Sequence, residues 1–131
     1  MADPLNVLVF SPDFAKIAQG LIALQEIACI ELLSSRDDLM EVIGNLSRHI
    51  DVLVYDDSTD LTPVEEMRQV RPCTPIICIS GNEQDYDLFV RMVGGSNVIT
   101  RWFGQSSYEQ VVARVREIAD EANDRVLPYG P

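Results

Sequence analysis

The sequence predicts an α/β fold: a doubly wound sheet of five parallel strands with helices on both faces, forming a three-layer sandwich. Two observations lead to this prediction. Five short apolar segments recur along the 131 residues, and a stretch with helical spacing follows each of them. Three of these segments, NVLVF, DVLVY and PIICI, are apolar at nearly every position. That pattern is typical of parallel strands that helices cover on both faces.

The predicted strands and helices alternate strictly along the chain. The strands are expected at 6–10, 28–33, 51–55, 75–79 and 97–100, and the helices at 12–25, 37–48, 63–70, 83–93 and 108–123. Ser11 before Pro12 is a typical helix N-cap with proline at the first helical position. The segment Thr62-Pro63-Val64-Glu65 is typical of a capping box, and Gly94-Gly95 is expected to end the fourth helix.

The length and the end of the chain suggest the domain organisation. A chain of 131 residues is enough for one ordinary domain. We expect this domain to span residues 1–123. Residues 124–131 lose the helical pattern and contain two prolines, so they are expected to form a tail or the start of a linker.

Composition excludes several kinds of partner. The net charge of −11 argues against direct binding of nucleic acid and against docking on anionic lipid. The N-terminus has no basic region and only a short apolar run, so it predicts neither a signal peptide nor a membrane span. Cys29 and Cys78 lie in apolar runs and are expected to be buried thiols, which suits a reducing compartment. These observations predict a cytoplasmic protein.

The polar residues that follow the strands are the candidates for chemistry. Ligands of doubly wound sheets bind beyond the carboxyl ends of the strands. The residues found there are Ser11, Pro12 and Asp13 after the first strand, Asp56 and Asp57 after the third, Ser80 after the fourth, and Arg101 and Trp102 after the fifth. Carboxylates, a hydroxyl and a cation at one edge indicate a site for a phosphoryl group. A structural interpretation, with caps, turns and an ion pair between Asp56 and Arg101, stays open.

The sequence does not contain the motifs of several other common binding and catalytic sites. The sequence contains no P-loop, no dinucleotide-binding glycine motif and no nucleophile elbow. The single histidine, His49, is expected at the surface at the end of the second helix, where its charge would complement the helix dipole. One histidine and three scattered cysteines do not make a zinc site.

Three segments carry a resemblance to a family. The segments DVLVYD (51–56), PIICISG (75–81) and GGSNVITRWF (94–103) together resemble the receiver domains of two-component response regulators, over roughly residues 5–122. The resemblance implies the flavodoxin-like (βα)5 arrangement of CheY-like domains. It also implies that Asp56 accepts a phosphoryl group, that Ser80 hydrogen-bonds this group, and that Arg101 stands in place of the family's lysine.

The chain departs from the family at the magnesium site. The family has two adjacent acidic residues after the first strand, whereas this chain has Ser11 and Pro12, and only Asp13 follows. Proline offers no side-chain ligand, and Mg²⁺ requires oxygen ligands. Asp13 and Asp56 are therefore weak Mg²⁺ candidates, and no other cofactor is expected. Trp102 replaces the family's proline after the lysine position.

These features predict an atypical receiver, or pseudo-receiver. We expect a non-enzymatic signalling module that binds proteins, with impaired or absent Mg²⁺-dependent phosphorylation of Asp56. Expected partners are a histidine kinase, an output domain or a second copy in a homodimer. They would bind a surface on the fourth helix, fifth strand and fifth helix that includes Arg91, Trp102 and Tyr108. Two alternatives stay open: a working phospho-acceptor, and the N-terminal domain of a larger protein such as a pilus-assembly ATPase.

Overall fold

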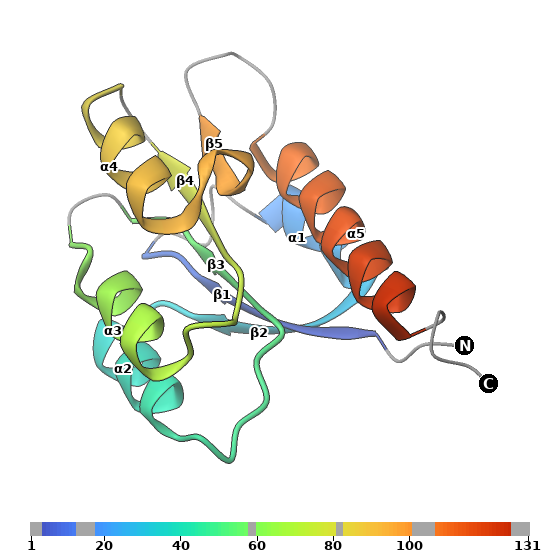
Figure 1. Cartoon of the computed structure of the whole chain (residues 1–131), viewed down its shortest axis with the longest axis horizontal. Helices are drawn as coiled ribbons and strands as arrows, with labels where there is room; N and C mark the ends of the chain where they lie inside the picture. The colour runs from blue at the N-terminus through green and yellow to red at the C-terminus, as the bar shows by residue number, and fades with distance from the viewer. Residues whose placement is uncertain (1–3, 13–17, 58–59, 81–82, 101–106, 127–131) are drawn as a thin grey trace.

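The strands form one parallel sheet. The computed structural model describes residues 4–12, 18–57, 60–80, 83–100 and 107–126 (Figure 1). The strands pair in the order β2-β1-β3-β4-β5, and every pairing is parallel. Their bounds are Leu5–Phe10 for β1, Ala28–Leu33 for β2, Val52–Tyr55 for β3, Ile76–Ser80 for β4 and Val98–Thr100 for β5. The predicted doubly wound sheet is confirmed, and each predicted strand end lies within one residue of the observed one.

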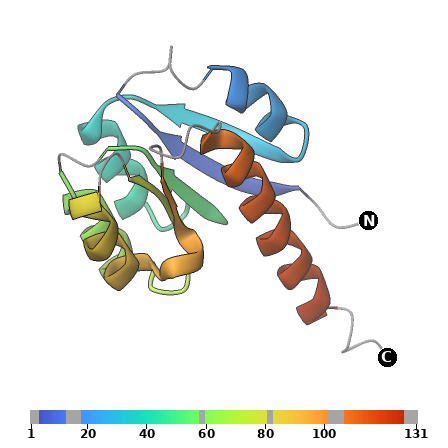
Figure 2. The same ribbon diagram turned by 90° about the horizontal axis from the view of Figure 1, so that it is seen from above.

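Helices cover both faces of this sheet (Figures 1 and 2). The described helices are α1 (Ala18–Gln25), α2 (Arg36–Gly44), α3 (Thr62–Val70), α4 (Glu83–Val93) and α5 (Ser107–Val126), with a short 3-10 turn, η2, at Gly95–Asn97. Helices α1 and α5 lie on one face, and α2, α3 and α4 lie on the other.

The apolar strands supply both halves of the core. In β1, Val7 and Val9 pack against α1 and α5, whereas Leu8 and Phe10 pack on the opposite side with α2, α3 and α4. The side chains of β3 alternate between the two faces in the same way. Successive side chains of a strand point to opposite faces, so a strand buried on both faces is apolar at every position.

The second helix is shorter than predicted. It ends at Gly44, and the backbone N–H of Asn45 donates to the carbonyls of Glu41 and Val42. His49 is therefore not at a helix end, and that prediction was wrong. It is exposed as predicted, and its Nε2 lies 2.7 Å from Oδ1 of Asp51.

The third helix begins differently from the predicted capping box. Thr62 is the first residue of α3 and does not cap it; the side-chain acceptor is Asp60, whose Oδ1 accepts from Thr62 N at 2.9 Å and from Thr62 Oγ1 at 2.7 Å. Pro63 does occupy the first turn, as predicted. Asp60 accepts better than a hydroxyl because its oxygen is charged.

The first and last helices also differ from their predicted bounds. Pro12 is not helical, so the predicted start at Ser11 and Pro12 was wrong; α1 is described from Ala18, and residues 13–17 lie outside the described residues. Helix α5 continues to Val126, three residues past the predicted end. Gly94 ends α4 as predicted, with a φ of 89°.

The cysteines fall into two environments. Cys78 is buried as predicted, and burial raises the pKa of its thiol to about 12. Cys29 is exposed, contrary to prediction. The reason is that β2 is an edge strand, with a neighbour on one side only. Within the described ranges, no helix combines the length and apolar composition that a membrane span requires.

Candidate functional site

The buried polar residues of the described chain gather at one edge of the sheet. Ser11 follows β1, Asp56 and Asp57 follow β3, and Ser80 is the last residue of β4. Their exposed fractions are 2%, 7%, 8% and 0%, and they are the buried polar or charged residues among those whose side-chain burial the structure describes. Three adjacent parallel strands thus bring these side chains to their common carboxyl ends, as the sequence predicted.

Backbone hydrogen bonds place Ser11 beside Asp56. The Asp56 N–H donates to the Phe10 carbonyl at 2.9 Å, and the Ser11 N–H donates to the Leu33 carbonyl at 3.1 Å. The pairing of the strands therefore extends one residue beyond their ends. The Ser11 hydroxyl donates to Oδ2 of Asp56 at 3.4 Å, a long hydrogen bond.

Arg36 joins this edge from α2, although no sequence motif pointed to it. Its Nη2 lies 3.2 Å from Oδ2 of Asp57, and its Nη1 lies 3.1 Å from Oδ2 of Asp60. The Asp57 side chain is only 5% exposed, whereas that of Arg36 is 46% exposed. Arg36 and Asp57 are 21 residues apart, so no local sequence signal pairs them.

The residue before Asp56 fixes the same segment from inside the core. Tyr55 is fully buried, stacks on Phe10 with ring centroids 5.3 Å apart, and donates its hydroxyl to the backbone carbonyl of Asp60. Burial, and then the charges of Asp57 and Asp60, raise the pKa of Tyr55 above its ordinary value. Tyr55 is therefore neutral and acts as a hydrogen-bond donor.

Comparison with solved structures identifies the fold. No protein-family model matches the sequence, and neither does any curated protein sequence. Solved structures do match. The response regulator DrrB of Thermotoga maritima, an OmpR/PhoB homologue, is 18% identical with a TM-score of 0.71, over 92% of this chain and 54% of that one. The receiver domain of Francisella response regulator 1452 is 17% identical with a TM-score of 0.72, over 90% of this chain and 98% of that one.

The chain has the receiver-domain fold. A chain described as adenylate cyclase from Rhodopirellula baltica shares this fold, at 13% identity and a TM-score of 0.69, over 98% of this chain and all of the other. At identities of 13–18%, the likeness establishes the fold alone. This chain spans about half the length of the Thermotoga regulator.

The surroundings of Asp56 bear on the predicted magnesium site. Across the described residues, no three His, Cys, Asp or Glu side chains come together in a way that could hold a metal ion. Beside Asp56, the position after β1 carries the Ser11 hydroxyl, a neutral group that donates to the carboxylate. The described residue beside Asp56 thus supplies a hydroxyl where the family resemblance implies a carboxylate, and Asp13 and Asp56 as Mg²⁺ ligands stay predictions. Asp13 lies outside the described residues.

The remaining predicted site residues are only partly described. Arg101 and Trp102 lie outside the described residues, as does Asp13. Arg91 lies on α4 and is exposed, and Tyr108 belongs to α5. The structure therefore places Ser11, Asp56 and Ser80 at the same edge of the sheet, while the roles of all the predicted site residues stay predictions.

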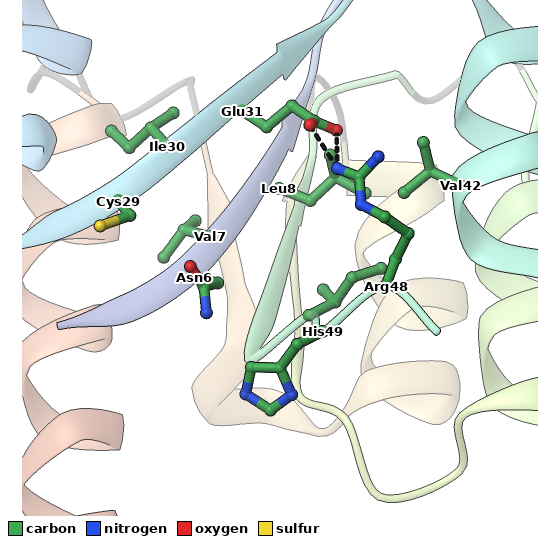
Figure 3. Close-up of a pocket in the computed structure, with 10 residues that line it drawn as sticks. Asn6, Val7, Leu8, Cys29, Ile30, Glu31, Val42, Arg48 and His49 are labelled. Atoms are coloured by element: carbon green, nitrogen blue, oxygen red, sulfur yellow. Dashed lines mark hydrogen bonds and ion pairs between the residues drawn. The ribbon is translucent and has the colours of Figure 1, made fainter. Parts of the chain in front are cut away.

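A separate pocket of about 340 Å³ lies toward the amino ends of β1 and β2 (Figure 3). It is beside the end of α2, and Asn6, Leu8 and Cys29 are among the residues that line it. Arg48 extends across it toward Glu31, and its Nη2 lies 2.6 Å from Oε2 of that residue. None of the predicted site residues that the structure describes lines this pocket.

Proposed function

We propose that the chain is a receiver-like signalling module that acts through protein–protein contacts, with impaired or absent Mg²⁺-dependent phosphorylation of Asp56. The observation that carries this proposal is the pair Ser11 and Pro12 after β1, with the Ser11 hydroxyl directed at Asp56. A metal that neutralises the transferring phosphoryl group needs anionic ligands at this position. A hydroxyl and a proline do not supply them.

A working phospho-acceptor is the second candidate. It is supported by Asp56 and Ser80, which are buried at the ends of the adjacent strands β3 and β4. In this reaction an Asp56 carboxylate oxygen would attack the phosphorus of a phosphodonor. The bond to the donor's leaving group would break, and an aspartyl phosphate would form.

Amide NMR spectra with and without Mg²⁺ and beryllofluoride, a phosphoryl mimic, separate the two candidates. We expect no change in the spectrum at millimolar Mg²⁺. Shifts centred on Asp56 and Ser80 that disappear in Asp56→Asn would overturn the proposal and establish a phosphorylation switch. Acetyl phosphate as a small phosphodonor, with detection of the added mass, gives the corresponding covalent measurement.

The proposed partner surface lies on α4, β5 and α5. It is supported by Leu88, whose side chain is 42% exposed although it is large and apolar, and by the exposed Arg91 and Arg116. Trp102 and Tyr108 complete the proposed surface, since a large aromatic side chain is a common anchor of protein interfaces. We propose that a second copy, a histidine kinase or an output domain binds there, in the cytoplasm.

Charge reversal tests this surface. Arg91→Glu on α4 is expected to abolish self-association in sedimentation equilibrium, because it places a repulsive charge within the surface. Arg68→Glu, on the exposed side of α3, is the matched control, since it changes the net charge equally away from the surface. Equal association of both variants and the unmodified chain would exclude the proposed dimer surface.

Residues 124–131 concern the proposed end of the domain. Helix α5 runs to Val126, so the proposed boundary after residue 123 falls in its last turn. We propose that a tail or linker follows this helix. A larger protein with this chain at its N-terminus, such as a pilus-assembly ATPase, is the alternative, and mass spectrometry of the native gene product distinguishes the two.

A further inference from the structure

Ser11, Asp56, Asp57 and Ser80 lie at the carboxyl ends of β1, β3 and β4, and we call this group the acceptor edge. Arg36 links the acceptor edge to α2, a helix that does not carry any of the predicted site residues. It is the first residue of α2, whose N-cap Ser35 accepts a hydrogen bond from the Asp38 N–H. From this position its two terminal nitrogens reach two different carboxylates, Asp57 at 3.2 Å and Asp60 at 3.1 Å. A planar guanidinium spans two acceptors with a fixed geometry, which a single ammonium does not do.

The segment that holds these carboxylates is also tied at its backbone. The Tyr55 hydroxyl donates to the Asp60 carbonyl, and the Asp60 carboxylate accepts from Thr62. Asp56 itself is joined to Phe10 through its N–H. Asp60 is thus fixed to β3 through Tyr55, to α3 through Thr62 and to α2 through Arg36, which also holds Asp57.

We propose that Arg36 is a positioning residue of the acceptor edge: by holding Asp57 and Asp60 against the start of α2, it fixes the side chain of Asp56 toward Ser11. This inference rests on the proposed function, since it gives the acceptor edge a single conformation without a phosphoryl group. Asp57 is adjacent to Asp56 and its side chain is almost completely buried. The charge of Arg36 neutralises the Asp57 carboxylate, so Asp57 has a structural role in this proposal and Asp56 is the candidate acceptor.

Amide hydrogen exchange of the whole chain tests the proposal. Three amides with defined acceptors report on the segment: Asp56 to the Phe10 carbonyl, Thr62 to the Asp60 carboxylate and Glu65 to the Leu61 carbonyl. In Arg36→Gln we expect these amides to exchange at least fivefold faster, while amides at the centre of β1 and β3 are unchanged. Arg36→Lys should restore part of the protection, because it can neutralise one carboxylate without bridging both.

Arg48→Gln is the matched control. Arg48 forms an ion pair with Glu31, and these side chains are 44% and 42% exposed and line the separate pocket toward the amino ends of β1 and β2. We expect this variant to leave the three reporter amides unchanged. The difference between Arg36→Gln and the unmodified chain should also shrink in 1 M NaCl, since salt screens an ion pair in which one partner is half exposed.

A second variant separates positioning from a general loss of stability. Tyr55→Phe removes the backbone tie to the same segment. If Arg36 and Tyr55 stabilise the same segment, the change in exchange free energy of the reporter amides in the double variant should differ from the sum of the changes in the single variants. Reporter exchange in Arg36→Gln no faster than in Arg48→Gln would overturn the proposal. A positive beryllofluoride response would instead overturn the proposed function and leave the exchange result standing.

Discussion

At the scale of single residues, Arg71 donates hydrogen bonds to the end of α2 and to the segment that follows it, where the sequence predicted a further helical turn. Its Nε, Nη1 and Nη2 donate to the carbonyls of Ile43, Arg48 and Asn45 at 3.1, 2.9 and 2.8 Å. The last carbonyls of a helix have no partner within the helix, and a cation near them is favourable. One guanidinium from the end of α3 therefore holds the end of α2 and the connection to β3.

Arg71→Ala tests this role. The variant removes these three hydrogen bonds, of which the one to the Ile43 carbonyl is partly buried, so we expect a loss of about 2 kcal/mol in the free energy of unfolding, measured by urea titration. Arg68→Ala, on the exposed side of the same helix, should change this quantity by less than about 0.5 kcal/mol. Equal losses in the two variants would show that Arg71 contributes no more than an exposed residue.

Asp60 contributes to the dependence of stability on pH in the acid range. The hydrogen bonds from the Thr62 N–H and hydroxyl, and then the charge of Arg36, hold the pKa of Asp60 below its ordinary value of 3.8. A carboxylate with a lowered pKa stabilises the folded state above its unfolded pKa, and this contribution is lost as pH falls through the folded value. Asp60→Asn should therefore lose less stability between pH 5 and pH 2 than the unmodified chain.

At the scale of elements, Gly94 connects α4 to β5. Its N–H donates to the Val90 carbonyl, and its φ of 89° with ψ of 148° is a region that residues with a side chain rarely adopt. The turn leads to Asn97, whose side chain donates to the Val93 carbonyl and accepts from Arg114 Nε of α5. This junction therefore joins the two helices of the proposed partner surface.

Alanine substitution of two glycines tests the backbone requirement. At Gly94 and at Gly44 an added Cβ would meet no atom within 4 Å, so only the backbone conformation distinguishes the positions. We expect Gly94→Ala to destabilise the fold by about 1–2 kcal/mol. Gly44→Ala at the end of α2 should be neutral or slightly stabilising, because it restricts the unfolded chain. Thermal unfolding checks both, and equal midpoints would contradict the argument.

At the scale of the whole molecule, excess negative charge opposes folding. A net charge of −11 concentrates repulsion in the compact state, and salt screens it. We expect the midpoint of thermal unfolding at pH 7 to rise by about 3 °C between 0.05 and 0.5 M NaCl, equivalent to roughly 1 kcal/mol. A midpoint that falls would show that attractive ion pairs outweigh the repulsion.

The sequence alone determined the order of the strands along the chain and the general place of the site. The segments NVLVF, DVLVY and PIICI predicted buried parallel strands because their composition is a local property. Since parallel strands end at one edge, the sequence was sufficient to place Asp56 and Ser80 together. The missing acidic pair at Ser11 and Pro12 was also visible from the sequence.

Tertiary structure alone decided where α2 ends, which cation pairs with Asp57, and which thiols are buried. Arg71 reaches Ile43 across 28 residues, and Arg36 reaches Asp57 across 21. Cys29 is exposed because its strand lies at the edge of the sheet. The physical reason is the same in each case: the deciding partner is distant in the sequence, so no local pattern of residues records the contact.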